Sequence, residues 1–155
     1  MKGNERLIEQ LNARLAEELA AINQYMVHSE MCENWGYGKL HGMIEKRAFQ
    51  EMRHAEKLIE RILYLEGRPI VTNLGKITIG PEVDKMHKHD WDAEADAIKK
   101  YNETIHLAAE VGDNGTKTIL EAILSEEEEH IDWIEAQTDQ IGQMGIQNYL
   151  TEQME

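Results

Sequence analysis

Apolar residues recur every three or four positions through most of the chain, a spacing that predicts long amphipathic helices. Four such helices are expected over residues 5–34, 39–66, 82–111 and 115–141, and a short fifth helix over 146–153. The residues expected to face inward are Leu11, Leu15, Ile22, Tyr25, Ile44, Ala48, Leu58, Ile62, Leu65, Trp91, Ile98, Tyr101, Ile105 and Ala108. Both prolines, Pro69 and Pro81, lie in one short region, which leaves the long stretches free to be helical.

The lengths of the connections predict the topology. Only a few residues separate the first helix from the second and the third from the fourth, so each pair is expected to be an antiparallel hairpin. Residues 67–80, between the hairpins, are poor in helix formers and at about 3.4 Å per residue can reach roughly 48 Å. A helix of about 30 residues is roughly 45 Å long. The sequence therefore predicts an all-α antiparallel four-helix bundle with one long crossover loop and a short fifth C-terminal helix. The second and third helices should start at the same end.

Length and composition indicate a single domain, and the net charge argues against one class of partner. The 155 residues are 41% hydrophobic and 30% charged, which is typical of a single globular domain spanning residues 1–155. The net charge of −14 argues against a nucleic-acid partner. An acidic surface either attracts cations or simply keeps the protein soluble.

Cysteine usage and hydropathy predict a compartment. The single cysteine, Cys32, cannot form an internal disulfide, which favours a reducing environment. No window is apolar enough to span a membrane, and the first residues lack the apolar stretch of a secretory signal. We therefore expect a cytoplasmic protein with no membrane partner.

Six residues of metal-ligand type form a triplet that occurs twice. The two triplets are Glu18, Glu51, His54 and Glu94, Glu127, His130. Each member of the second triplet follows its counterpart by the same 76 positions, and Tyr25 and Tyr101 obey the same offset. A Glu from each of two helices, with a Glu-x-x-His pair from each of the other two, is the arrangement that holds two metal ions in a bundle core.

The acidic members of the triplets fall within apolar stripes, where ionised groups are costly unless they are paired or bound to metal. Four carboxylates and two imidazoles suit a pair of ions such as Fe or Mn. The alternative is a set of buried acids hydrogen-bonded to one another, which the repeated offset disfavours. A third Glu-x-x-His pair, Glu103 and His106, points away from the helix face that holds Glu94 and is expected in solvent.

Other polar residues carry weaker signals. Tyr25 and Tyr101 either hydrogen-bond a ligand carboxylate or simply fill the core. The run 126–129 is expected to be mostly a solvated face, with Glu127 the exception, and Cys32 is expected to be a small buried residue rather than a reactive thiol. The histidines expected at the surface, because they have no partners at matching spacing, are His28, His41, His87 and His89.

Several longer stretches are specific enough to identify a family: MKG, ELAAINQY, EMRHAE, RILYLEG, EEEEHIDWIE and MGIQNYL. With these stretches the chain closely resembles the bacterioferritins over essentially its whole length. The resemblance implies a ferritin-like bundle and a shell of about 24 subunits, built from two-fold dimers, around a mineral cavity. Iron would be stored there as ferric mineral, after oxidation of Fe(II) to Fe(III) by O₂ or H₂O₂ at a di-iron ferroxidase centre within each subunit.

The resemblance also implies residue roles. In the family pattern one iron is bound by Glu18 and His54 and the other by Glu94 and His130, while Glu51 and Glu127 bridge the two. A b-type haem shared between two subunits would be held by Met52 from each. By itself a methionine is more often a gap filler, so this assignment depends on the resemblance. The residues at the positions of the haem pocket and dimer contact are Leu19, Ile22, Asn23, Met26, Phe49 and Ile59. A small ferredoxin is the expected partner for iron release.

The chain departs from some members of the family in two places. Lys46 and Gln50 occupy the positions of a His and an Asp that bind a further iron on the inner surface, and neither suits iron binding. Leu58 occupies the position of a redox-active tyrosine, whereas Tyr25 and Trp133 remain. These departures put the inner-surface site in doubt and favour a di-iron centre that acts as a gate for iron itself.

Two other functions remain open at this point. One is a di-iron peroxidase or oxidase without bulk storage, although the Cys-x-x-Cys pairs of a rubredoxin-like domain are absent. The other is a non-enzymatic shell protein that carries haem or protects DNA. Small starvation-type ferritins place their ligands between subunits and lack the doubled set found here.

Overall fold

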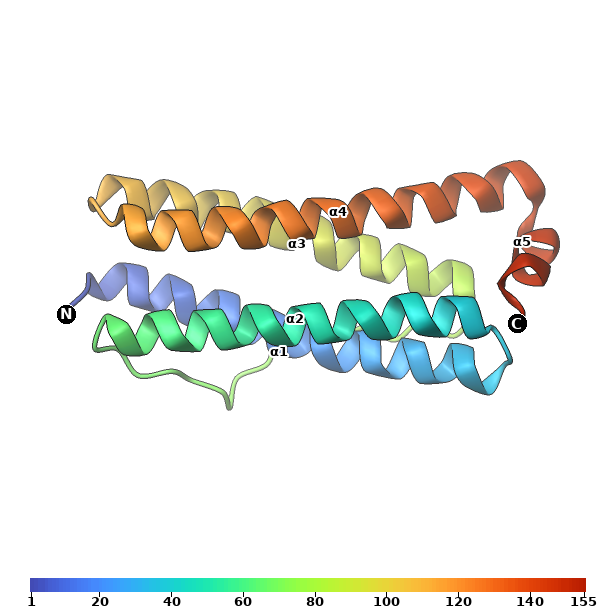
Figure 1. Cartoon of the computed structure of the whole chain (residues 1–155), viewed down its shortest axis with the longest axis horizontal. Helices are drawn as coiled ribbons and strands as arrows, with labels where there is room; N and C mark the ends of the chain where they lie inside the picture. Colours follow the sequence, from blue (N-terminus) through green and yellow to red (C-terminus); the bar gives the residue numbers. More distant parts are fainter.

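The computed structural model describes residues 1–155 and is helical apart from its connections. Its helices are α1 (Glu5–Asn34), α2 (Gly38–Tyr64), α3 (Val83–Glu110), α4 (Asn114–Met144) and α5 (Ile146–Gln153). The four long helices lie along one another and α5 turns back across one end (Figure 1). The expected all-α four-helix bundle with a short fifth helix is confirmed. The fourth helix continues to Met144, beyond the expected end near residue 141.

The chain forms two antiparallel hairpins joined by a crossover. Helix α1 packs mainly against α2, and α3 packs mainly against α4. The segment between α2 and α3 runs the length of the bundle, so that both helices start at the same end (Figure 1). The helix α5 packs on α4 and α2. This topology follows from two short turns and one long connection, as the connection lengths predict.

Residues that favour helix ends occupy several helix termini. Asn4 caps α1, because its side-chain oxygen accepts a hydrogen bond from the Leu7 N–H at 3.0 Å. Asp113 caps α4 in the same way and also accepts a hydrogen bond from Arg61 of α2 at 3.0 Å, which ties the two hairpins together. Gly145 has φ +81°, a conformation that favours glycine, and it separates α4 from α5.

The apolar core consists of two separate clusters along the bundle. One contains Leu7, Leu11, Leu15, Ala55, Leu58, Ile62, Leu65, Tyr101, Leu107, Ala108, Leu120 and Ile123. The other contains Tyr25, Cys32, Leu40, Ile44, Ala48, Val83, Met86 and Tyr149. In α1, Glu18 falls between members of the two clusters, and in α2, Glu51 and His54 do the same. The bundle therefore has a buried polar layer between two apolar halves.

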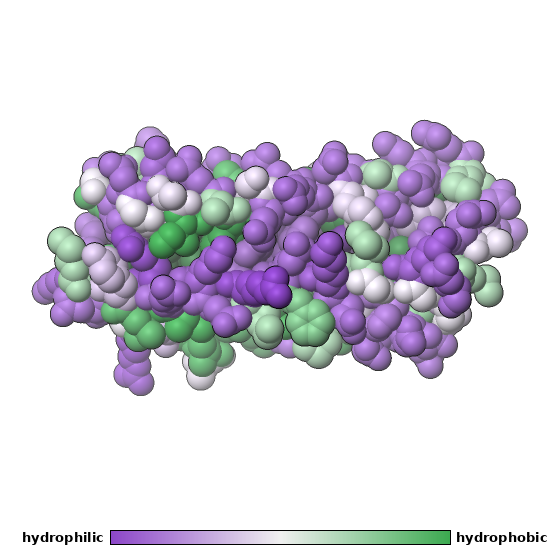
Figure 2. Space-filling view, in the orientation of Figure 1, coloured by the Kyte–Doolittle hydropathy of each residue, from purple (hydrophilic) through white to green (hydrophobic).

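The surface is mostly hydrophilic, with apolar side chains gathered in places. Figure 2 shows them along the lower part of the face, where α2 and the crossover segment lie in Figure 1. Exposed apolar residues of these segments and of α1 include Met26, Phe49, Met52, Leu63, Val71 and Leu74. None of the helices combines the length and apolar composition that crossing a membrane requires.

Candidate metal centre

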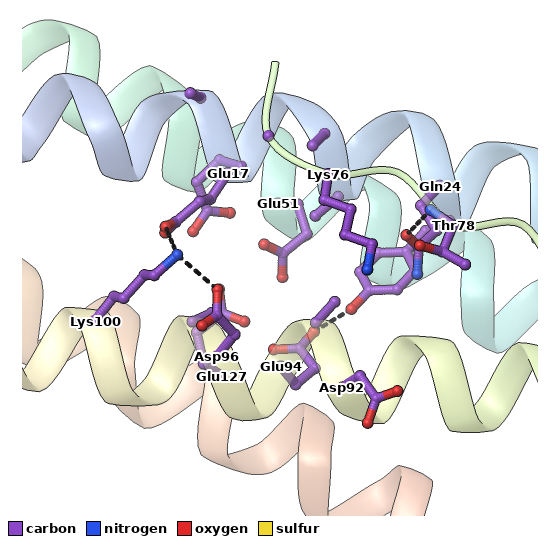
Figure 3. A pocket seen from close by; sticks show the side chains of 18 of the residues that line it. Glu17, Gln24, Glu51, Lys76, Thr78, Asp92, Glu94, Asp96, Lys100 and Glu127 are labelled. Atoms are coloured by element: carbon purple, nitrogen blue, oxygen red, sulfur yellow. Dashed lines mark hydrogen bonds and ion pairs between the residues drawn. The ribbon is translucent and has the colours of Figure 1, made fainter. Parts of the chain in front are cut away.

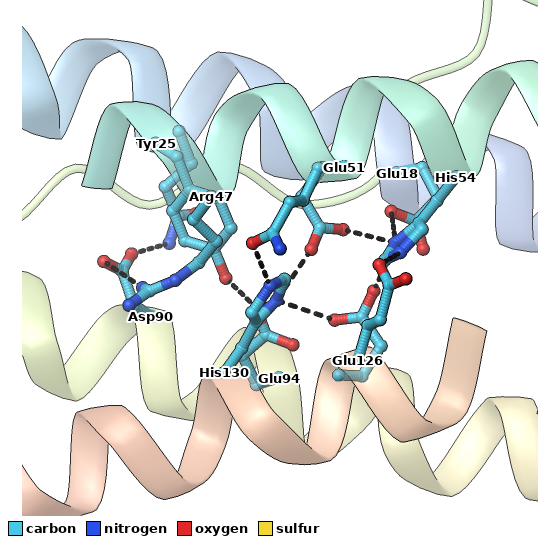
Figure 4. Close-up of polar contacts among 12 residues, drawn as sticks. Glu18, Tyr25, Arg47, Glu51, His54, Asp90, Glu94, Glu126 and His130 are labelled. Atoms are coloured by element: carbon cyan, nitrogen blue, oxygen red, sulfur yellow. Dashed lines mark hydrogen bonds and ion pairs between the residues drawn. The ribbon is translucent and has the colours of Figure 1, made fainter. Parts of the chain in front are cut away.

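The six repeated residues meet in the polar layer, one or two from each long helix (Figure 4). All six side chains are buried. Two groups have ligand atoms within 4.8 Å of one another: Glu18, Glu51, His54, Glu127 and Glu51, Glu94, Glu127, His130. Because Glu51 and Glu127 belong to both groups, the two groups adjoin and share two carboxylates.

His54 is oriented by a carboxylate outside the cluster. Its Nε2 lies 2.6 Å from Glu126 Oε2, and its Nδ1 lies 2.9 Å from Glu127 Oε1. The Nδ1 atom is also 3.5 Å from Glu18 and 3.6 Å from Glu51. With Nε2–H donating to Glu126, the Nδ1 lone pair can face a metal ion among these carboxylates.

His130 repeats this arrangement with a different partner. Its Nε2 donates to Gln50 Oε1 at 2.8 Å. Its Nδ1 lies 3.0 Å from Glu51, 3.4 Å from Glu94 and 3.6 Å from Glu127. The second imidazole therefore also presents Nδ1 to a group of carboxylates. Of the run 126–129, which was expected to be mostly solvated, Glu128 and Glu129 are exposed, whereas Glu126 is only partly exposed because its carboxylate contacts His54.

The two tyrosines hydrogen-bond the cluster from opposite apolar halves. The Tyr101 hydroxyl donates to Glu18 Oε1 at 2.6 Å, and the Tyr25 hydroxyl donates to Glu94 Oε1. Burial raises the pKa of both phenols well above the usual value, so both remain protonated donors. Of the two interpretations open from the sequence, hydrogen bonding to a cluster carboxylate is the one that the structure confirms.

Burial changes the ionisation of the cluster when no metal is bound. Desolvation and the neighbouring Glu18 carboxylate raise the pKa of Glu51 to about 8. Desolvation and Glu127 raise the pKa of Glu94 to about 8 and also raise that of Glu18. Desolvation lowers the pKa of His130, but its contacts with the surrounding glutamates outweigh this and raise it to about 11. The metal-free cluster therefore holds protons that bound cations would displace.

Several buried polar atoms in the cluster have no hydrogen-bond partner. They are Glu18 Oε2, Glu51 Oε1, Glu94 Oε2 and His130 Nδ1. His130 Nδ1 and Glu51 Oε1 are only 3.0 Å apart, yet their geometry is not that of a hydrogen bond. Buried polar atoms are normally paired, so ligand-type atoms that converge without hydrogen-bond partners fit a site for cations, which would displace the protons that the metal-free cluster holds. The donor set of carboxylates and imidazoles suits Fe or Mn.

A cavity of about 740 Å³ leads to the cluster between α1 and α3, beneath the crossover segment. Carboxylates of Glu18, Glu51, Glu94 and Glu127 line it, together with six alanines whose small side chains leave it open. Charged residues also line it, among them Glu17, Asp96 and Lys100 (Figure 3). The cavity therefore connects the buried carboxylates to solvent within a single chain.

Two of the histidines expected at the surface are buried, so that expectation is wrong for His28 and His87. Burial lowers the pKa of His87 to about 4, and its Nε2 lies 3.1 Å from the Tyr149 hydroxyl. His41 and His89 are partly buried. The burial of His28 could have been predicted from helical periodicity, because His28 lies three residues after Tyr25 and therefore on the same, inward face of the helix.

Asp90 is a buried residue that the sequence analysis did not single out. Its Oδ1 accepts hydrogen bonds from Gln24 at 2.8 Å and from His28 Nδ1 at 3.0 Å. The Arg47 guanidinium lies 3.8 Å from Asp90 Oδ2 and over the Tyr25 ring (Figure 4). This second polar cluster adjoins the metal-type cluster through Tyr25.

The other sequence expectations concern residues away from the cluster. Glu103 and His106 are exposed, as expected for the Glu-x-x-His pair outside the repeat. Cys32 is fully buried, as expected.

The positions at which the chain departs from the family pattern lie outside the six-residue cluster. Lys46 is exposed, and the Gln50 side chain accepts a hydrogen bond from His130. Leu58 lies in the apolar core. Met52 is 43% exposed on α2, pointing away from the cluster that holds Glu51.

Fold and site together define a class: a four-helix bundle with a long crossover and a doubled carboxylate–histidine cluster, which is the ferritin-like arrangement. Residues 8–144 match the ferritin-like domain of the ferritin family. The chain is 40% identical to the bacterioferritin of Rhodobacter capsulatus over 149 residues, covering 96% of this chain and 92% of the relative. It is 37% identical to that of Mycobacterium leprae and 36% identical to that of Brucella melitensis, again over 96% of this chain. The chain belongs to the bacterioferritin family.

Proposed function

We propose that this protein stores iron and that its six buried ligands form a ferroxidase centre. The observation that carries the proposal is the pair of adjoining buried groups with converging, unpaired carboxylate and imidazole atoms. Buried acids that only hydrogen-bonded one another would leave fewer buried polar atoms without a hydrogen-bond partner. The family membership supports iron as the metal.

The geometry supports a division of roles among the ligands. Glu18 and His54 bind one substrate Fe(II) ion, Glu94 and His130 bind the other, and Glu51 and Glu127 bridge the two. This follows the two ligand groups, since only Glu51 and Glu127 belong to both. Gln50 and Glu126 hold the imidazoles with Nδ1 turned inward.

The residues of the chain favour oxidation of the bound Fe(II). Four buried carboxylates stabilise the higher charge of Fe(III) more than that of Fe(II), because their attraction grows with the charge of the ion in a poorly solvated site. Each of two Fe(II) ions loses one electron. The two electrons and two protons convert O₂ to H₂O₂, or H₂O₂ to two water molecules. Tyr25 and Tyr101 hold Glu94 and Glu18 in place throughout.

We also propose a haem site at Met52 on the two-fold axis of a dimer. Met52 is exposed on α2, and two other exposed apolar residues, Phe49 one helical turn earlier on α2 and Met26 on α1, are 54% and 51% exposed. A thioether is a known axial ligand of haem iron, so the residues present fit the group. When bound, the haem would supply a one-electron carrier that a small ferredoxin reduces for iron release.

Exposed apolar side chains support assembly. They occur on α1, α2 and the crossover segment, and contact with a second copy of the chain would bury them. We propose that such two-fold dimers build a shell of about 24 subunits in the cytoplasm.

One experiment tests storage directly. Fe(II) is added in air to the purified protein, and the iron that co-elutes with the protein is measured after gel filtration. A large particle that retains hundreds of irons or more is expected. Saturation at about two irons per subunit would contradict storage and would instead support a di-iron peroxidase or oxidase.

A further inference from the structure

The mouth of the cavity between α1 and α3 is bridged by a lysine. Lys100 Nζ lies 3.2 Å from Glu17 Oε1 on α1 and 2.8 Å from Asp96 Oδ2 on its own helix, α3 (Figure 3). All three residues line the cavity whose inner wall carries the carboxylates of the metal cluster. The ammonium group therefore lies between two carboxylates on the way from solvent to the buried ligands.

The Glu17 carboxylate is held in place by Arg14, so its contact with Lys100 differs from an ion pair between two mobile surface side chains. Arg14 is 4% exposed and binds Glu17 with two contacts, Nε to Oε2 at 2.8 Å and Nη2 to Oε1 at 2.9 Å. Its Nη1 donates to the Lys100 carbonyl at 3.1 Å and to Thr104 Oγ1 at 2.9 Å. The Glu17 carboxylate is thus fixed relative to α3, opposite Lys100.

The charges along the cavity are arranged like those of a cation path. Asp92 joins Glu17 and Asp96 among the lining residues, and four further carboxylates line the inner part. Lys76 from the crossover segment is the other cationic lysine that lines it. The alanines along the wall have no polar atoms in their side chains that could bind a cation. An ammonium held between carboxylates occupies a position that a hydrated divalent cation would otherwise favour.

We infer that Lys100 is a built-in cation that controls the passage of divalent metal ions through this cavity to the buried cluster. The inference rests on the proposed function, since it concerns access to that same site. An entering ion must displace the ammonium from Glu17 and Asp96, and it also meets the repulsion of the lysine charge. Hydrogen bonding to Asp96 and the charge of Glu17 raise the pKa of Lys100, so the charge persists at neutral pH. Lys100 tunes the rate of entry, and the ligands fix how many ions bind.

The test measures the rate at which Co²⁺ enters the assembled, metal-free protein, by stopped-flow detection of its visible absorption bands. Lys100→Gln removes the charge and should speed entry roughly three- to tenfold at low ionic strength. High salt should reduce this difference, because it screens the charges at the mouth. Lys100→Arg keeps the charge and should retain a rate close to that of the unmodified protein.

A matched control lies one residue away. Lys99 is exposed on α3 and does not line the cavity, so Lys99→Gln makes the same change in net charge and should leave the rate nearly unchanged. Equal rates for the two glutamine variants, with normal final absorption in both, would overturn the role of Lys100 alone. Absence of Co²⁺ bands in the unmodified protein would overturn the proposed metal centre and this inference with it.

Discussion

At the scale of single residues, the position of a side chain in the bundle decides its chemistry. Glu94 and Glu103 are both glutamates of α3, yet Glu94 is buried in the cluster and Glu103 is exposed. The difference arises because nine residues separate them, which turns Glu103 to the opposite side of the helix. Glu103 therefore serves as a control position for tests of the proposed metal centre.

Replacing Glu94 with Gln should slow Fe(II) oxidation at least about tenfold, because one carboxylate of the proposed ferroxidase centre is lost. Initial rates of Fe(II) oxidation, followed by absorbance, measure the effect. Glu103→Gln removes the same charge from the exposed pair and should oxidise Fe(II) at the rate of the unmodified protein. Equal rates for the two variants, with both proteins folded, would refute the ligand assignment.

The residues that orient the imidazoles should matter nearly as much as the ligands. Gln50→Ala removes the acceptor of the His130 Nε2–H, which frees the ring to rotate away from the carboxylates. We expect the affinity for Co²⁺ or Zn²⁺ to fall roughly 10- to 100-fold, measured by calorimetric titration. Lys46→Ala, four residues earlier on α2 and exposed, serves as the control. An unchanged affinity in Gln50→Ala would show that the ring is held by other contacts.

At the scale of elements, the crossover is fixed to the bundle by side chains of α1. Gln24 Oε1 accepts a hydrogen bond from the Thr78 N–H at 3.0 Å, and His28 Nε2 accepts one from the Gly80 N–H at 2.9 Å. Asp90 of α3 holds both of these side chains in place. One buried carboxylate therefore connects α1, α3 and the segment that covers the cavity.

Asp90→Ala should loosen this segment and destabilise the protein by about 1–3 kcal/mol, because it leaves Arg47 buried without its nearest carboxylate. The thermal unfolding midpoint should fall, and limited proteolysis should cut faster within residues 67–82. Asp132→Ala, at an exposed position on α4, should change neither quantity. Unchanged proteolysis in Asp90→Ala would mean that the crossover is held by its other contacts.

At the scale of the whole molecule, buried apolar residues stabilise the bundle, and exposed apolar residues favour contact with a second copy. The buried clusters hold the four helices together around the polar layer, whereas the exposed apolar residues of α1, α2 and the crossover segment remain unpartnered in a single chain. An apolar surface of this kind is costly in water, which favours its burial against a second copy. The haem proposed at Met52 would lie within that contact.

Met52→Leu should abolish haem binding, because it replaces the thioether with a side chain of similar size that cannot bind iron. The haem absorption of the purified protein measures this, while its elution volume in gel filtration and its rate of Fe(II) oxidation should be unaffected. Met43→Leu, at an exposed methionine on the same helix, should keep its haem. Full haem absorption in Met52→Leu would exclude Met52 as the axial ligand.

The sequence by itself determined the helices, their topology and the six residues of the cluster. Helical periodicity depends on local spacing, and Glu18 or His130 could be found because the same spacing occurs twice in the chain. The family followed from longer stretches, and the comparisons confirm it.

Only the tertiary structure decided which side chains become partners across helices. The burial of His28 and His87, the contacts of Gln50 and Glu126 with the imidazoles, and the position of Asp90 depend on how each helix is rotated and packed. Lys100 likewise meets Glu17 only because α1 and α3 pack side by side. Periodicity assigns a residue to a face of its own helix, but a contact at about 3 Å requires the register between helices, which side-chain packing over the whole bundle sets.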